Sequence, residues 1–383
     1  MVDPIYLDYN ATTPHDPEVV AAMRPYLESH FGNPSSSHAY GRKTREAIAI
    51  AREQIARLLN CTADEVVFTG GGTESNNMAI KGIAFAKQAH GNHIITSQVE
   101  HPAVIEVCEY LERQGFEVTY LPVDEWGRVD VNVVKEAITE HTILITVMHA
   151  NNEVGTIQPV VEIAALGRER NITVHTDAAQ SVGKIPVDVE ALGVDLLSVA
   201  GHKVYAPKGI GVLYVRDGVK LEKFMHGAGH EGGRRAGTEN VLEIVGLGKA
   251  CEVIRWDLEG HMKHLQTTRD RLQRGLEARI ADVRVNGHPD LRLPNTLSIS
   301  FKGVEANALL EAIQNWVAAS AGAACHAGEV ALSSVLQAMD VSEEWGMGTL
   351  RFSTGRGVNE SEIDVAIQVI VDAVAKLRGE NSS

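Results

Sequence analysis

The sequence predicts an α/β fold with a mostly parallel sheet flanked by helices, and two observations support this prediction. Seven short apolar runs follow one another between Glu65 and Val215, and stretches with helical periodicity lie between them. The runs are almost continuously apolar, which is typical of strands that are buried on both faces of a sheet. Strands and helices that alternate in this way favour a parallel sheet covered by helices on both sides.

Each element of this fold has its own signal in the chain. Asp16, Pro17 and Glu18 combine a helix N-cap, a proline in the first turn and an acidic residue that suits the helix dipole. The stretch Thr44–Leu59 carries its apolar residues on one helical face. The strands that we expect are Glu65–Thr69, His93–Ser97, Glu117–Leu121, Thr142–Met148, Thr173–Thr176, Leu196–Val199 and Gly211–Val215.

The character of the sequence changes after about residue 260. A long polar helix, Leu258–Ile280, precedes the segment Asn295–Phe301, whose alternating pattern predicts a half-exposed strand. Further helices and strands follow. We therefore expect a large domain of residues 16–260, and a small α+β domain formed by residues 1–15 together with residues 261–383.

The composition is typical of a soluble globular protein and excludes several classes of function. The 383 residues are 44% hydrophobic and 22% charged, and the net charge of −15 argues against general binding to nucleic acid or to an anionic membrane. No apolar run is long enough to cross a bilayer, and the segment MVDPIYLDYN has no secretory signal. The four cysteines are widely spaced, and neither CxxC nor HExxH occurs, so we expect reduced thiols in the cytoplasm and no metal site.

Lys203 has the most informative surroundings in the chain. It lies in a glycine-containing loop between two predicted strands, and Asp177 lies at the end of an earlier strand. A lysine and a carboxylate so placed suit pyridoxal phosphate, because the lysine forms a Schiff base with the cofactor and the carboxylate keeps the pyridine nitrogen protonated. A solvated surface lysine is the alternative interpretation, and the buried strands on either side and the adjacent His202 argue against it.

Several other polar residues share this position at the end of a predicted strand. The segment Phe68–Asn77 is a strand, a glycine turn and a helix start, whose free N–H groups favour a bound dianion. Each such residue alone has an ordinary structural explanation, but together they predict one site at one edge of the sheet. The residues that come directly after a predicted strand are Gly72, Thr73, His101, Asn152, Asp177 and Lys203.

Two residues of the predicted small domain also carry chemistry. Arg351 lies between apolar neighbours, and its planar fork could bind a substrate carboxylate or form a structural ion pair. Cys325 lies among small residues that favour a loop, and the neighbouring His326 would favour the thiolate. We interpret Cys61, Cys108 and Cys251 as structural cysteines.

At this point the motifs resemble a known family over essentially the whole chain. The sequence is similar to the NifS/IscS-type cysteine desulfurases, which are fold-type I pyridoxal phosphate enzymes of the class V aminotransferase family. The stretches that carry the resemblance are YLDYNATTP, GNPSS, FTGGGTESNN, VEHPAV, HANNEVGTIQP, HTDAAQSVGK, GHKVYAPKGIG, GGRRAGTEN, SAGAACHAG and LRFSTGR.

The resemblance implies a role for each matching residue. Lys203 would bind the cofactor covalently, Asp177 would pair with its pyridine nitrogen and His101 would stack on its ring. Arg351 would hold the substrate carboxylate, and Cys325 would take the sulfur. The other contacts to the cofactor, its phosphate or the substrate would come from Gly72, Thr73, Asn152, Gln180, Ser198 and His202, with Thr238 supplied by the second subunit of a homodimer.

The implied activity is the conversion of L-cysteine to L-alanine, with sulfur transferred to Cys325 as a persulfide. The sulfur would pass to an acceptor protein such as an iron–sulfur scaffold or a component of tRNA or DNA thiolation. Cys325 and Arg351 are 26 positions apart, which resembles the group with a long, mobile cysteine loop. Selenocysteine lyase remains an alternative because Ala323, His326 and Ala327 depart from the common pattern, although Pro102 stands where a selenium-selective lyase is expected to have an acidic residue. A transaminase or β-lyase that does not use the cysteine, and a non-enzymatic platform for sulfur acceptors, are further alternatives.

Overall fold

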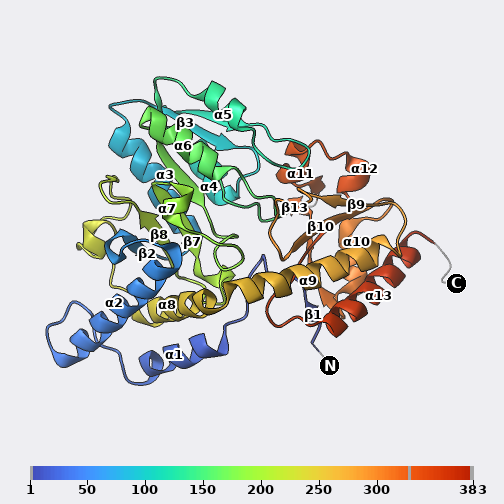
Figure 1. The fold of residues 1–383 in the computed structure, drawn as a ribbon, viewed down its shortest axis with the longest axis horizontal. Helices are drawn as coiled ribbons and strands as arrows, with labels where there is room; N and C mark the ends of the chain where they lie inside the picture. Colours follow the sequence, from blue (N-terminus) through green and yellow to red (C-terminus); the bar gives the residue numbers. More distant parts are fainter. Residues whose placement is uncertain (1–2, 327–328, 380–383) are drawn as a thin grey trace.

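A computed structural model of the chain centres on a seven-stranded sheet with helices on both faces (Figure 1). The structure describes residues 3–326 and 329–379, and it describes no side chain between residues 323 and 331. The strand order is β2-β8-β7-β6-β5-β3-β4, in which β8 alone runs antiparallel to its neighbours. The strands are β2 (Val66–Thr69), β3 (His93–Ser97), β4 (Glu117–Leu121), β5 (Thr142–Thr146), β6 (Thr173–Asp177), β7 (Leu196–Ala200) and β8 (Gly211–Val215).

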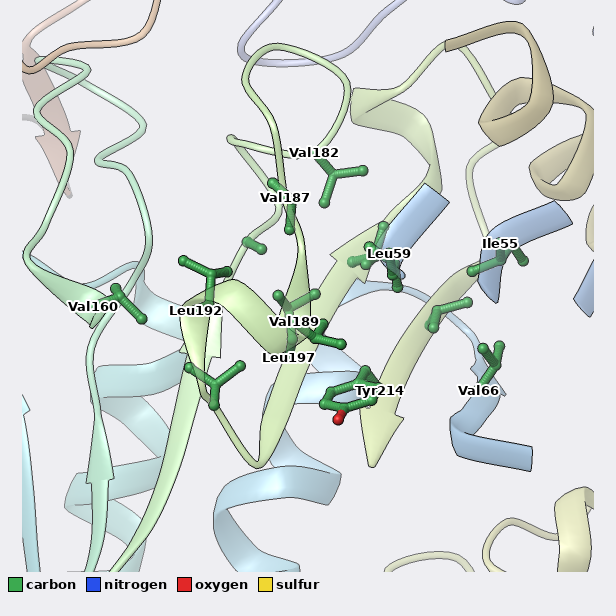
Figure 2. Packing of buried hydrophobic residues seen from close by; sticks show 14 of the residues in the cluster. Ile55, Leu59, Val66, Val160, Val182, Val187, Val189, Leu192, Leu197 and Tyr214 are labelled. Atoms are coloured by element: carbon green, nitrogen blue, oxygen red, sulfur yellow. The ribbon is translucent and has the colours of Figure 1, made fainter. Parts of the chain in front are cut away.

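Helices cover this sheet on both sides because successive strand residues point to opposite faces. Leu196 joins a hydrophobic core with α3 and α4, whereas the next residue, Leu197, joins a core with α2, α6 and α8 on the other face. Figure 2 shows this second core, where Leu197 and Tyr214 of the sheet lie near Leu59. The helices of this part are α1 (Pro17–Glu28), α2 (Ala39–Leu59), α3 (Gly72–Lys87), α4 (Pro102–Glu112), α5 (Val131–Ala137), α6 (Val160–Arg170), α7 (Val189–Leu192) and α8 (Val241–Trp256), with 3₁₀ turns η1 (Ala63–Glu65), η2 (Gly201–Lys203) and η3 (Glu231–Gly233).

A separate core forms around an antiparallel sheet of order β12-β15-β10-β9. Helix α9 runs from the side of α8 to this second sheet (Figure 1). The N-terminal segment belongs here, since Leu7 and Tyr9 join the core and β1 pairs with β11. The division into residues 16–260 and residues 1–15 with 261–383 stays a prediction. The elements are β1 (Ile5–Tyr6), α9 (Leu258–Glu277), β9 (Val283–Asn286), β10 (Thr296–Phe301), α10 (Ala306–Ile313), β11 (Val317–Ala318), β12 (Ser320–Ala321), β13 (Ala323–His326), β14 (Glu329–Leu332), α11 (Ser334–Ala338), α12 (Glu343–Gly346), β15 (Thr349–Ser353) and α13 (Glu360–Leu377).

The fold class predicted from the sequence is confirmed, and each of the seven predicted strands is present with its ends shifted by at most two residues. The expected start of α1 is also correct, because Asp16 accepts a hydrogen bond from the Glu18 N–H at 2.8 Å. Among the described residues, no helix has both the length and the apolar character needed to cross a lipid bilayer.

Two expectations for the C-terminal part were wrong. Strand β10 was expected to be half-exposed, but all its residues are buried. The Ser300 hydroxyl of this strand can be buried because it has hydrogen-bond partners: Asn286 Nδ2 donates to Ser300 Oγ at 2.9 Å, and Ser300 Oγ lies 2.7 Å from Thr349 Oγ1. The stretch around Cys325, expected to be a loop, contains an antiparallel hairpin of β13 and β14, in which the backbone of Cys325 pairs with that of Val330.

Candidate active site

A cavity of about 430 Å³ lies at the carboxyl edge of the large sheet. Strands β2, β3, β5, β6 and β7 run parallel to one another, so the loops that follow them meet at one edge. The sequence-predicted residues that line the cavity are Gly72, Thr73, His101, Asn152, Asp177, Gln180, His202, Lys203 and Arg351. The structure therefore places these residues together at one edge of the sheet, as the sequence predicted.

Lys203 ends the 3₁₀ turn η2 directly after β7, which directs its amine into the cavity region. Its Nζ donates hydrogen bonds to the backbone oxygens of Asn10 at 2.5 Å and Ala11 at 2.7 Å. The pKa of Lys203 is lowered to about 8, mainly by burial and also by the charge of Arg351, while Asp8 and Asp177 act in the opposite direction. A substantial neutral fraction near pH 8 makes this amine a competent nucleophile and base.

Asp177 ends β6 and is held by two hydrogen bonds at the wall of the cavity. Asn76 Nδ2 donates to Asp177 Oδ2 at 2.6 Å, and the Ala179 N–H donates to Asp177 Oδ1 at 2.9 Å. Asn76 lies in the first turns of α3. This helix therefore holds the Asp177 carboxylate through Asn76, and its N-terminal residues Gly72 and Thr73 line the same cavity. A fixed, buried carboxylate of this kind can pair with a protonated ring nitrogen.

The N-terminus of α3 offers an anion-binding edge to the same cavity. Gly71 has φ of +144°, a conformation that favours glycine, and it leads into Gly72 and Thr73 at the start of the helix. A Cβ atom at Gly72 would lie 3.2 Å from the Cβ of Ala200, so a larger residue would crowd the cavity wall. The free N–H groups of the first helical turn and the helix dipole together favour a phosphate here.

His101 and Asn152 form another part of the wall. His101 is the N-cap of α4, and its Nδ1 accepts a hydrogen bond from the Ala103 N–H at 3.0 Å, which fixes the ring orientation. Loss of hydration lowers the pKa of His101, nearby Asp177 raises it and Lys203 lowers it. His202, whose pKa burial lowers to about 4, lies beside Lys203 with its Nδ1 3.3 Å from Thr12 Oγ1.

Arg351 reaches the cavity from β15, and its partners tie the two parts of the chain together. One terminal nitrogen, Nη2, donates to Asp8 Oδ1 at 2.9 Å and to Ser320 Oγ at 3.1 Å. The other, Nη1, donates to the backbone oxygen of Asn152 at 3.1 Å. The Nε atom is buried and has no partner among the described residues.

Two residues predicted to act here do not line the cavity. Ser198 was expected to contact the phosphate, but its side chain is buried on β7 and its Oγ lies 3.0 Å from His175 Nε2, so the expectation of a direct contact is corrected. Thr238 is exposed on the surface and does not line the cavity, so its expected contact in the site of a second subunit stays a prediction. The Cys325 side chain lies outside the described residues. Burial raises the thiol pKa of Cys61, Cys108 and Cys251 to about 12, which fits their interpretation as structural cysteines.

Some residues of the site were not identified from the sequence. Asn10 and Asn76 line the cavity, and Asp8 pairs with Arg351. Asn76 follows the glycine turn by one helical turn, and this spacing is a signal that could have revealed it. Asp8 and Asn10 lie in the motif YLDYNATTP, but no local sequence pattern indicates which distant residues they contact.

The arrangement could bind a flat aromatic ring that carries a phosphate, a basic ring nitrogen and a carbonyl group. The helix N-terminus can hold the phosphate, Asp177 the ring nitrogen and the Lys203 amine the carbonyl carbon. Arg351 also lines the cavity, and a guanidinium there could bind the carboxylate of a second molecule.

Comparison with known proteins supports the same interpretation. The aminotransferase class-V family model matches residues 5–365. The chain is 48% identical to the cysteine desulfurase IscS of Dictyoglomus turgidum over 375 residues, covering 98% of this chain and 95% of the relative. It is 45% identical to the cysteine desulfurase IscS of Clostridium botulinum, with the same coverage.

Solved structures show the same relationship. A NifS-like protein superposes with a TM-score of 0.92 at 35% identity, over 97% of this chain and all of that protein. SspA in complex with cysteine superposes with a TM-score of 0.82 at 39% identity, over 92% of this chain and 99% of that protein.

Proposed function

The chain belongs to the aminotransferase class-V family and is a cysteine desulfurase, and we propose that the cavity at the sheet edge is its active site, with pyridoxal phosphate as cofactor. The observation that carries the proposed site is the meeting of the Lys203 amine, the Asp177 carboxylate and the N-terminus of α3 around one cavity. When bound, pyridoxal phosphate supplies an electron sink for the charge that develops at the substrate Cα.

The residues of the cavity would bind and orient both molecules. Lys203 would hold the cofactor, Gly72 and Thr73 its phosphate, Asp177 its ring nitrogen and His101 its ring face. Gln180 and His202 would add polar contacts to the cofactor. Ser198 would act only indirectly, by supporting His175 beneath the site.

For the substrate, we propose that Arg351 binds the carboxylate of L-cysteine and that Asn152 contacts the bound amino acid. Lys203 Nζ would then remove the proton at the substrate Cα. A pKa of about 8 leaves part of this amine neutral near physiological pH, as a general base requires.

Cys325 would take the sulfur atom. Its thiolate sulfur would attack the sulfur of the substrate, forming an S–S bond while the carbon–sulfur bond breaks and its electron pair remains with the carbon fragment. Protonation of that fragment gives L-alanine. The sum is one L-cysteine and one Cys325 thiol converted into one L-alanine and one Cys325 persulfide, so atoms and electrons balance.

We further propose that the enzyme is a cytoplasmic homodimer in which the partner supplies the residue equivalent to Thr238, and that a protein acceptor receives the persulfide sulfur. The exposure of Thr238 in the single chain supports a role across subunits. An acceptor from iron–sulfur assembly or from tRNA or DNA thiolation would have to reach the β13–β14 hairpin, where the Cys325 backbone lies.

The test of the proposal combines a spectrum with product analysis. The purified chain should absorb visible light after incubation with pyridoxal phosphate, the absorption should change on addition of L-cysteine, and alanine and sulfide should form in equal amounts with a reductant present. A protein that binds no pyridoxal phosphate would contradict the proposal. Comparable turnover of selenocysteine and cysteine would favour the lyase alternative.

A further inference from the structure

A second lysine, Lys184, is buried beside the candidate active site, and the proposed reaction gives it no role. It is only 6% exposed. Its Nζ donates to Gln180 Oε1 at 2.6 Å and to Asn10 Oδ1 at 3.2 Å. Within residues 3–326 and 329–379, no carboxylate forms an ion pair with this amine, whereas Asp8 pairs with Arg351 instead. A buried lysine without a counter-ion is costly in its charged form.

The hydrogen-bond count at Lys184 matches a neutral amine. A lysine ammonium carries three N–H donors, and its neutral amine carries two. Two acceptors bond to Nζ among the described residues, the side-chain oxygens of Asn10 and Gln180. Burial lowers the pKa of Lys184 well below its usual range, and the charges of Lys203 and Arg351 lower it further. Besides Lys203, the titratable groups that line the small space next to Lys184 are Tyr9, Tyr205, His261 and Arg356, and none of them carries a carboxylate.

Lys184 also fixes which way the Gln180 amide points. Gln180 Nε2 donates to the backbone oxygen of Asn10 at 3.0 Å, and that oxygen can only accept. The amide oxygen Oε1 must therefore face Lys184, which satisfies it with an N–H. The second hydrogen of Nε2 has no partner among the described residues, and Gln180 lines the cavity, so the residue can present only a donor to a ligand.

The same backbone oxygen of Asn10 accepts the hydrogen bond from Lys203 Nζ at 2.5 Å. Lys184, Gln180, Asn10 and Lys203 thus form one connected network. Its remaining members hold Asn10 in place, since Asn10 Nδ2 donates to Thr296 Oγ1 at 2.9 Å and Asn10 Oδ1 accepts from Asn295 Nδ2 at 3.0 Å.

We propose that Lys184 is a neutral positioning residue that orients the Gln180 amide and the Asn10 backbone, and through them places the Lys203 amine in the cavity. The inference rests on the proposed function of Lys203, but the charge state and the network can be tested without catalysis.

The charge state is measured on the unmodified chain. With lysine labelled with ¹³C at Cε, NMR at pH 7 should show one lysine signal in its neutral position, and this signal should be missing from the spectrum of Lys184→Gln. If every lysine signal is in its charged position at pH 7, Lys184 is a cation and the proposal is wrong. The refuting result is obtained on the unmodified chain and needs no variant, whereas the Lys184→Gln spectrum assigns a neutral signal to Lys184 rather than to Lys203.

The network is tested by cofactor binding to apoprotein. Lys184→Met removes both donors at similar volume, and it should weaken pyridoxal phosphate binding roughly three- to tenfold, the value of about one hydrogen bond. Lys184→Gln keeps a neutral donor and should recover part of this loss. The matched control, Lys135→Met on exposed α5, should bind like the unmodified chain.

The pH profile separates positioning from a charge effect. Because a neutral Lys184 contributes no charge, the pH midpoint of cofactor uptake, which reports Lys203, should stay the same in Lys184→Met. A rise of about one pH unit, or unchanged affinity in Lys184→Met, would overturn the proposal. If the unmodified chain forms no alanine from L-cysteine, the proposed function fails, whereas these binding and NMR results still decide the role of Lys184.

Discussion

Replacement of Arg351 by alanine tests the proposed substrate contact most directly. A guanidinium that grips a carboxylate makes two charge-assisted hydrogen bonds, each worth about 1.5–3 kcal/mol. The lower limit for the pair is about 3 kcal/mol, and since 1.4 kcal/mol is a factor of ten, KM for L-cysteine should rise roughly 100-fold. Arg351→Lys keeps the charge without the fork and should raise KM by roughly tenfold.

The structure adds a second component to this prediction. Arg351 neutralises Asp8 through a contact of 2.9 Å, so its removal leaves a carboxylate of 17% side-chain exposure facing the place proposed for the substrate carboxylate. Part of the KM increase should therefore come from repulsion. Adding Asp8→Asn to Arg351→Ala should lower KM again, because the amide keeps the shape and removes the charge.

Initial rates of alanine formation against L-cysteine concentration give kcat and KM separately for each variant. Arg271→Ala is the control, because Arg271 makes a two-point contact with Asp364 at 2.7 Å on the surface and does not line the cavity. Its KM should not change. If KM in Arg351→Ala stays within about twofold of the unmodified enzyme, a factor worth only ~0.4 kcal/mol, the carboxylate does not bind at Arg351.

Three other perturbations have defined outcomes. Cys325→Ser should still bind pyridoxal phosphate and change its spectrum with L-cysteine, but sulfide release should fall by at least roughly 100-fold because a hydroxyl cannot replace the thiolate; undiminished release would exclude Cys325 as the sulfur acceptor. The rate of cofactor uptake by apoprotein should rise about tenfold per pH unit and level off above a pH of about 8, since the neutral Lys203 amine reacts; a flat profile between pH 6 and 9 would be inconsistent with this. Burial lowers the pKa of His175 from 6.5 to about 3, so between these values the unfolded chain binds a proton that the folded chain does not, and stability must fall as pH falls through this window. The melting temperature of His175→Gln should therefore drop less between pH 7 and 4 than that of the unmodified chain, and equal drops would refute this reasoning.

The large sheet was predictable because its signals are local. Each of its strands is a short apolar run, and Leu196 and Leu197 reach opposite cores only because both faces are covered. Strand β10 could not be predicted as buried by the same reasoning. Its serines look like a solvent-exposed face, and only the partners Asn286 and Thr349, contributed by neighbouring strands, make their burial possible.

Some residues of the site could likewise be predicted from local sequence, whereas their partners from distant parts of the chain could not. Residues that follow parallel strands must meet at one edge, so His101, Asp177 and Lys203 could be placed together without coordinates. The groups that tune them come from positions that no pattern connects to them: Asp8 is 343 positions from Arg351, and Asn10 is 174 positions from Lys184. Ser198 was wrongly expected at the site because it is close to Lys203 in the sequence. Side chains alternate between the two faces of β7, and that of Ser198 contacts His175 instead. Sequence reasoning therefore identifies the groups that can do the chemistry, whereas the charge state and orientation of those groups are set by contacts between distant parts of the chain. For this reason the protonation of Lys184 and the pairing of Asp8 are where the structure adds predictions that the motifs alone could not supply.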